Sequence, residues 1–157
     1  MKYIRAFAVS LFLLVLAAPV QATVVVNAQD DINFFAFVPC ADDGNGEFVE
    51  GEGRLHVLIR EGFDESGGQH YGTHFQPMGL KATGQVTGDR YNATGGTLET
   101  VNIAGSGLPF TQTFTNNFRM IGVGQAVNFT VHNTYHVTVN ANGDVTTVVD
   151  ISRTTCD

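Results

Sequence analysis

The sequence predicts an all-β protein, and three observations support that prediction. Apolar and polar residues alternate along most of the chain, at the period of two that places side chains on one face of a strand. Turn signals rich in Gly and Asn separate these runs, and no helical periodicity follows residue 22. Two cysteines, Cys40 and Cys156, stand near the two ends of the β region. We therefore expect a closed antiparallel β-barrel of about eight strands, with a two-sheet β-sandwich as the alternative.

Residues 1–22 are predicted to form a secretory signal peptide. Lys2 and Arg5 make a positive start, an apolar run follows, and Val20-Gln21-Ala22 fits a small-x-small cleavage site. The apolar run is too short to predict a membrane-spanning helix. We expect cleavage after Ala22, a secreted or periplasmic location, and one β-barrel domain over residues 23–157.

The predicted mature chain is acidic. Its 135 residues hold six Lys and Arg against fifteen Asp and Glu, a net charge of −9. Nucleic acids and anionic lipid surfaces both need positive charge on the protein. The composition therefore predicts neither nucleic-acid binding nor membrane insertion, and no motif predicts a cofactor.

Strands are expected wherever β-branched and aromatic residues alternate with polar ones between turn signals. Several of the short segments should merge, which gives seven to nine strands. Asn142-Gly143 is the strongest hairpin signal, because alternating runs flank it on both sides. Gly95-Gly96 is interpreted as a break. The expected segments are 23–28, 31–39, 46–50, 54–61, 69–76, 79–87, 89–93, 97–103, 110–121, 126–139 and 145–155.

The alternation also predicts which side chains share a face. The five histidines all fall on the more polar face of their strands: His56, His70, His74, His132 and His136. Across the Asn142-Gly143 hairpin, we expect Val149 and Ile151 to continue the apolar face and Asp150 to join the histidines. An antiparallel sheet with one buried and one solvated face requires such one-sided alternation.

An even number of cysteines in an exported protein predicts a disulfide between Cys40 and Cys156. Such a bond requires Cα atoms within about 7 Å. The first and last strands are therefore expected to be neighbours, which favours closure of the sheet.

The histidines are interpreted mainly as surface residues on a Thr-rich wall. A strand rises about 3.3 Å per residue, so His132 and His136 are roughly 13 Å apart and cannot share one metal ion while the strand is regular. We expect no metal site. An alternative polar site would form if the polar face lined a lumen, where imidazoles can act as acids and bases. Its members would be His56, Arg119, His132, His136 and Asp150.

The leading functional hypothesis is a binding module for a small apolar ligand. A barrel of this size, similar to lipocalin-like (calycin) or allene-oxide-cyclase-like barrels, is either packed solid or holds one small ligand. Aromatic walls suit an apolar ligand, and tyrosines can supply a polar contact. The candidate ligand-binding residues are Tyr71, Phe75, Phe114, Phe118, Phe129 and Tyr135, on a face that we expect also to hold Phe34, Phe35 and Phe37.

Two other functions remain open at this point. The first is a cyclase or isomerase that works in the barrel cavity by positioning its substrate, with Arg119, His132 and His136 as candidate groups. The second is an extracellular interaction protein that uses the Thr- and His-rich face. No catalytic residue is assigned.

The segment FRMIGVGQAVNFTVHNTYHVTVNANGDVT resembles a group of small exported bacterial all-β proteins of unknown function. The resemblance extends from Cys40 to Cys156 and includes the runs Gly53-Arg54-Leu55-His56 and Thr87-Gly88-Asp89-Arg90-Tyr91. It implies secretion and a shared β-fold, and it assigns no activity, ligand or catalytic residue.

Overall fold

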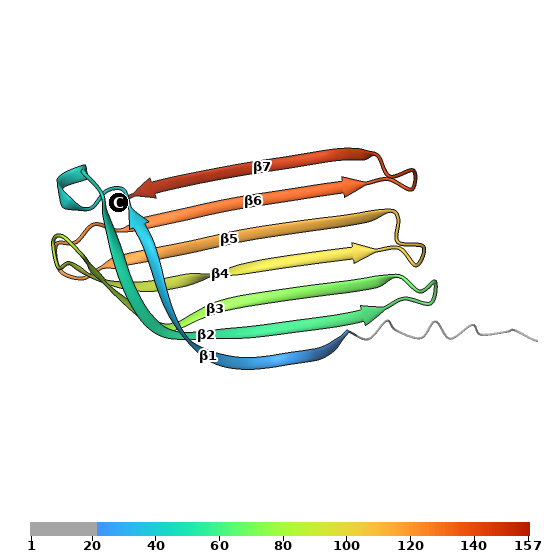
Figure 1. Ribbon diagram of the computed structural model, residues 1–157, viewed down its shortest axis with the longest axis horizontal. Coiled ribbons are helices and arrows are strands. Elements are labelled where there is room, and N and C mark those ends of the chain that lie inside the picture. Colours follow the sequence, from blue (N-terminus) through green and yellow to red (C-terminus); the bar gives the residue numbers. More distant parts are fainter. Residues whose placement is uncertain (1–21) are drawn as a thin grey trace, which may run out of the picture.

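A computed structural model describes residues 22–157 of the chain (Figure 1). The predicted signal peptide lies outside these residues, apart from Ala22. The described part forms seven strands and one short 3-10 helix, η1 (Asp42–Gly44). The strands are β1 (Thr23–Val38), β2 (Glu47–Phe63), β3 (Gln69–Gly84), β4 (Arg90–Ile103), β5 (Phe110–Gly122), β6 (Phe129–Val139) and β7 (Val145–Cys156).

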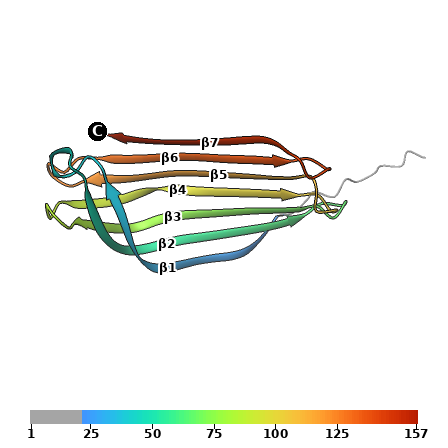
Figure 2. The same ribbon diagram turned by 45° about the horizontal axis from the view of Figure 1, so that its top comes forward.

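All seven strands belong to one antiparallel sheet in which each strand pairs with the next in sequence. The all-β prediction and the expected number of strands are confirmed. The sheet is not closed into a barrel, because β1 and β7 form its two edges, as Figure 2 shows. The Asn142-Gly143 hairpin is present between β6 and β7. The break predicted at Gly95-Gly96 is wrong, since β4 runs through both glycines.

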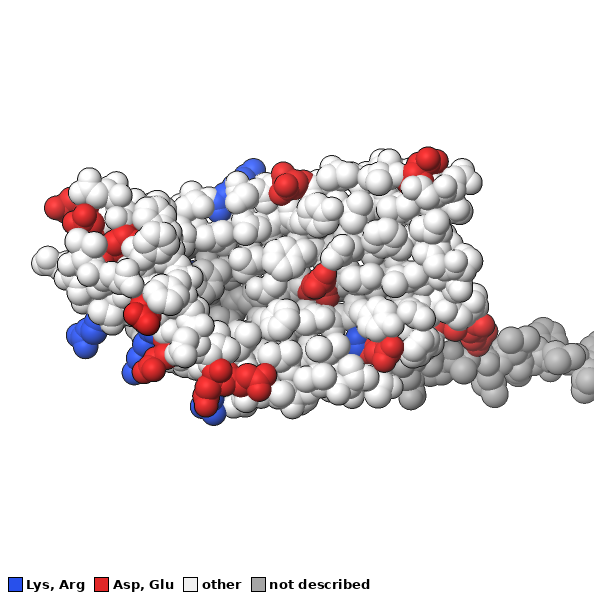
Figure 3. Space-filling view, in the orientation of Figure 1, with Lys and Arg blue, Asp and Glu red and all other residues white. Residues whose placement is uncertain are grey.

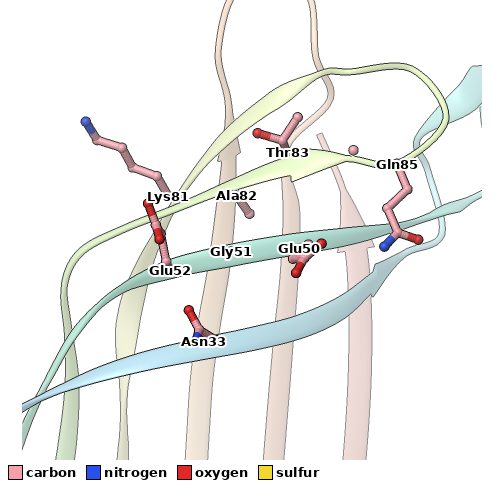
Figure 4. A pocket seen from close by; sticks show the side chains of 9 residues that line it. Asn33, Glu50, Gly51, Glu52, Lys81, Ala82, Thr83 and Gln85 are labelled. Atoms are coloured by element: carbon pink, nitrogen blue, oxygen red, sulfur yellow. The ribbon is translucent and has the colours of Figure 1, made fainter.

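A sharp bend in β1, β2 and β3 gives the molecule its shape. Beyond this bend β1 and β2 cross over the ends of β5 and β6, while β3 stays paired with the start of β4 (Figures 1 and 4). Gly79 has a φ of +66° at an irregularity where the β2–β3 register shifts. A Cβ at Gly53 would lie 2.7 Å from the Cα of Leu80, so β2 and β3 approach more closely than a side chain would allow.

The hydrophobic core lies under this bend, where two layers of sheet meet. Phe34 of β1 packs edge-to-face on Phe118 of β5, with ring centroids 6.3 Å apart. Toward the other end of the sheet, no described element covers the same face (Figures 1 and 2). The fold therefore has a closed, bent end and an open end. The buried core residues are Val38, Ala41, Val49, Leu80, Ala82, Tyr91, Ala93, Met120 and Phe129.

The predicted disulfide is present and fastens the bent end. Cys40, which follows β1, is bonded to Cys156 at the end of β7, with Cα atoms 6.0 Å apart. The first and last strands thus meet only at the disulfide, and no backbone hydrogen bonds pair β1 with β7. Within residues 22–157, no helix is both long and apolar enough to cross a bilayer.

Candidate ligand-binding site

The strand register divides the side chains of the sheet between two faces. Directly paired residues share a face, and the six candidate ligand-binding residues fall on one of them, which we call the aromatic face. For example, Phe75 pairs with Val57, and Phe114 pairs with Tyr135. Its members include Tyr71, Phe75, Phe114, Phe118, Phe129 and Tyr135.

Position along the aromatic face decides which of these rings a ligand can reach. Phe129 is only 5% exposed and belongs to the core under the bend, so it is not a contact residue. Tyr135 is 37% exposed and lies in the open half. Phe35 and Phe37, which we expected on this face, point to the other side and are 64% and 47% exposed. They alternate with Phe34, so the three cannot share a face.

An apolar cavity of about 260 Å³ opens on the aromatic face where the bend begins. Figure 3 shows this face hollowed beside the bend. Thr97 and Asn116 are among the few polar groups in the cavity wall, and the Thr97 hydroxyl donates a hydrogen bond to Asn116 Oδ1 at 2.9 Å. The wall is otherwise mainly aromatic and aliphatic. The lining residues are Ile32, Phe34, Leu55, Phe75, Pro77, Leu80, Gly96, Thr97, Asn116 and Phe118.

The aromatic face continues from this cavity toward the open end. In the next row of side chains, Glu99 of β4 is paired with Phe114 of β5, which is paired with Tyr135 of β6. Gln112 Nε2 donates a hydrogen bond to Glu99 Oε1 at 2.5 Å. Asp150 of β7 pairs with Tyr135 and ends the row. The row thus places two carboxylates, Glu99 and Asp150, beside two rings on a surface that nothing in residues 22–157 covers.

Tyr71 lies on the same face, near the open end of β3. Its hydroxyl donates a hydrogen bond to Gln69 Oε1 at 2.9 Å. Partial burial and the nearby carboxylate of Glu61 both disfavour the phenolate, so the pKa of Tyr71 is raised above its ordinary value. Tyr71 is therefore a neutral hydrogen-bonding group at any physiological pH.

The alternative polar site is not assembled, because its members lie on opposite faces. His56, Arg119, His132 and His136 lie on the face opposite the aromatic one, which we call the histidine face. Asp150 pairs with Tyr135 and therefore lies on the aromatic face. The prediction that Asp150 joins the histidines and that Val149 and Ile151 continue the apolar face is wrong, because a bulge between Thr138 and Val139 shifts the register by one residue.

The histidines form hydrogen bonds mainly with neutral side chains. His136 Nδ1 lies 2.8 Å from Thr113 Oγ1, and His56 Nε2 lies 2.7 Å from Asn27 Oδ1. His132 Nδ1 forms a hydrogen bond with Asn117 Oδ1. Within the described part of the chain, only His70 approaches a carboxylate, with Nε2 3.4 Å from Asp64 Oδ2. Among residues 22–157, no group of three or more His, Cys, Asp or Glu is placed to hold a metal ion.

A wider hollow of about 480 Å³ lies on the outer side of the bend, and sequence reasoning did not foresee it. Figure 4 shows its side chains, with Lys81 extending away from it. Polar and charged groups of both signs surround it, among them Asn33, Glu50, Glu52 and Lys81. It is a shallow groove with few apolar groups to exclude water, so the smaller apolar cavity is the better candidate site.

Glu47 is a buried carboxylate that the sequence pattern did not identify. It is 2% exposed and accepts hydrogen bonds from the Val86 amide at 2.9 Å and from the amide and hydroxyl of Thr87 at 3.0 and 2.6 Å. Burial acts to raise the pKa of Glu47, but these hydrogen bonds outweigh it and lower the pKa below the ordinary value. Glu47 thus fixes the β3–β4 turn and has a structural role.

Comparison with known proteins gives no relative: the chain matches no protein-family model, no curated protein and no solved structure. The functional assignment therefore rests on the geometry of the aromatic face and its cavity.

Proposed function

We propose that this chain is an exported β-sheet protein that binds a small apolar ligand on its aromatic face. The observation that supports the proposal is the apolar cavity of about 260 Å³ at the bend, which continues into a row of uncovered rings. Small-molecule sites are usually concave and mostly apolar, with a few polar groups that orient the ligand. The open trough takes the place of the barrel interior that the sequence predicted.

The size of the apolar surface is consistent with moderate affinity. A ligand that covers about 200 Å² of apolar surface gains roughly 5 kcal/mol before the cost of its immobilisation. Phe75 and Phe118 line the cavity, and Phe114 and Tyr135 extend the contact toward the open end. The hydroxyl of Tyr135, the Thr97–Asn116 pair and the amide of Gln112 can orient a polar group on the ligand.

We propose a secreted or periplasmic location. The Cys40–Cys156 disulfide supports it, because disulfides persist in oxidising compartments. The predicted signal peptide and the resemblance to small exported proteins point in the same direction.

Dye titration of the mature chain, residues 23–157, tests the binding proposal. We expect a hydrophobic dye such as Nile red to bind saturably, and native mass spectrometry to detect any ligand retained through purification. Phe75→Ala should weaken dye binding, because Phe75 lines the cavity. Phe35→Ala is the matched control, since Phe35 is exposed on the other face. A protein that binds no apolar dye, or equal losses in both folded variants, would overturn the proposal.

The structure does not favour the enzyme hypothesis. That hypothesis needs titratable groups inside a cavity, and Arg119, His132 and His136 lie on the histidine face instead. One observation supports the interaction-protein hypothesis. Two apolar side chains, Leu98 and Ile151, are exposed on the histidine face, beside its histidines and threonines. A His132→Ala variant that folds but no longer retains a partner would support this second function, and unchanged retention would count against it.

A further inference from the structure

The two faces of the sheet differ completely in positive charge. Among residues 22–157, every Lys, Arg and His side chain lies on the histidine face, and none lies on the aromatic face. The strand register places each of them on that face. For example, Arg60 pairs with Gly72, and Arg153 pairs with His132. These eleven residues are Arg54, His56, Arg60, His70, His74, Lys81, Arg90, Arg119, His132, His136 and Arg153.

Carboxylates, by contrast, are present on the aromatic face. Four carboxylates share this face: Asp30, Glu61, Glu99 and Asp150. The buried Glu47 also lies on it, but its carboxylate is hydrogen-bonded to the β3–β4 turn. Figure 3 shows an acidic side chain near the middle of the view, and most of the blue of Lys and Arg lies toward the margins. A ligand on the aromatic face therefore meets rings and negative charges, and no positive side chain of the described residues.

Glu99 is the carboxylate best placed to contact a ligand in the cavity. It is half-buried near the middle of the sheet, between Thr73 of β3 and Phe114 of β5. It is two residues from Thr97, which lines the cavity, so the two side chains are about 7 Å apart along the strand. Gln112 donates a hydrogen bond to one carboxylate oxygen, and no basic side chain of the described part of the chain lies on this face to neutralise the group.

We propose that the ligand of the aromatic face is a hydrophobic cation, an amine or quaternary ammonium with an apolar chain. This inference rests on the binding function proposed above. The cationic head would lie against Glu99, Phe114 and Tyr135, and the apolar chain would enter the cavity between Phe75 and Phe118.

Two physical effects favour the cation. Paired side chains on neighbouring strands have Cβ atoms about 5 Å apart, so one cation can contact both the Glu99 carboxylate and the ring of Phe114. A cation is attracted to the face of an aromatic ring within about 6 Å of its centroid. An apolar anion such as a fatty acid would instead meet several carboxylates with no counter-charge, and repulsion would exclude it.

The test compares three ligands that share a ten-carbon chain: decyltrimethylammonium, decyl maltoside and decyl sulfate. Each is titrated below its micelle-forming concentration, by displacement of the bound dye from the mature chain. We expect the cation to bind about tenfold more tightly than the neutral maltoside, and the sulfate to bind most weakly. Added salt should reduce the difference.

Two charge variants separate a local site from the general acidity of the chain. Glu99→Gln should lower the affinity for decyltrimethylammonium to about that for the maltoside. Glu50→Gln removes the same charge from an exposed position on the histidine face and should leave the affinity unchanged. Phe114→Leu keeps an apolar side chain and should weaken binding of the cation more than binding of the maltoside.

The possible results separate the preference for cations from the proposed binding of an apolar ligand. Equal binding of all three ligands would overturn the preference for cations and leave the apolar site standing. Equal losses from Glu99→Gln and Glu50→Gln would also overturn it, because they would show attraction to net charge alone. If none of the three ligands displaces the dye, the inference fails; if the dye itself does not bind, the proposed function fails as well.

Discussion

Cys40 and Cys156 are 116 residues apart in sequence, and their bond fastens the bent end of the sheet to the end of β7. Replacing both by serine should lower the free energy of unfolding by about 4–5 kcal/mol, since the disulfide restricts a long loop in the unfolded chain. Urea titrations of a protein of residues 23–157, with and without reductant, measure the loss. Equal midpoints in the two titrations would contradict the prediction.

Met120 is fully buried under the bend, whereas Leu98 is 50% exposed on the histidine face. Met120→Ala should cost about 2–5 kcal/mol, because it removes apolar contacts and leaves a cavity. Leu98→Ala, the matched control, should change stability by less than about 0.5 kcal/mol. Chemical denaturation followed by circular dichroism measures both. Similar losses in the two variants would show that the core does not lie under the bend.

Gly95 and Gly72 are both strand glycines, but their surroundings differ. A Cβ at Gly95, where φ is +109°, would lie 1.8 Å from the Asn117 carbonyl oxygen, whereas a Cβ at Gly72 meets nothing within 4 Å. Gly95→Ala should therefore destabilise the protein by about 1–3 kcal/mol. Gly72→Ala should be neutral or slightly stabilising, because alanine restricts the unfolded chain. Thermal melting of the two variants checks the contrast, and a stable Gly95→Ala variant would disprove it.

Glu47 should make stability depend on pH. Its pKa in the folded state is lowered from the ordinary value of 4.5, so its contribution is complete above that pH and is lost as the pH falls through the folded-state pKa. Wild-type protein should thus lose more unfolding free energy between about pH 5 and pH 3 than Glu47→Gln does. Denaturant titrations across this range test the effect.

The control for this titration is Glu50→Gln, whose carboxylate is exposed. It should follow the wild-type curve. A Glu47→Gln curve parallel to that of the wild type would show that the Glu47 carboxylate does not favour the folded state.

Sequence alternation predicted the content of each face wherever strands are regular. The predicted assignment of side chains to faces is confirmed for β5 and for the regular parts of β2 and β3, because side chains in a regular strand alternate strictly. The Asn142-Gly143 turn was also predictable, since its residue types suit the required backbone. The histidines were therefore placed on one face from the sequence alone.

The errors arise from single-residue irregularities. The bulge after Thr138 moved Asp150 to the aromatic face, and one inserted residue is enough to reverse every side chain beyond it. The bend at Gly53 and Gly79 depends on how closely two strands approach, which alternation does not encode. Because the cavity lies where that bend begins, the cavity could not be predicted.

The open sheet leaves β1 and β7 with a row of backbone amides and carbonyls that no neighbouring strand of the described chain occupies. Such edges are templates for ordered polymerisation of identical chains. Charged side chains interrupt both edges here, with Asp30 and Asp31 on β1 and Asp150 and Arg153 on β7. These four charges should therefore disfavour edge-to-edge pairing between copies of the chain.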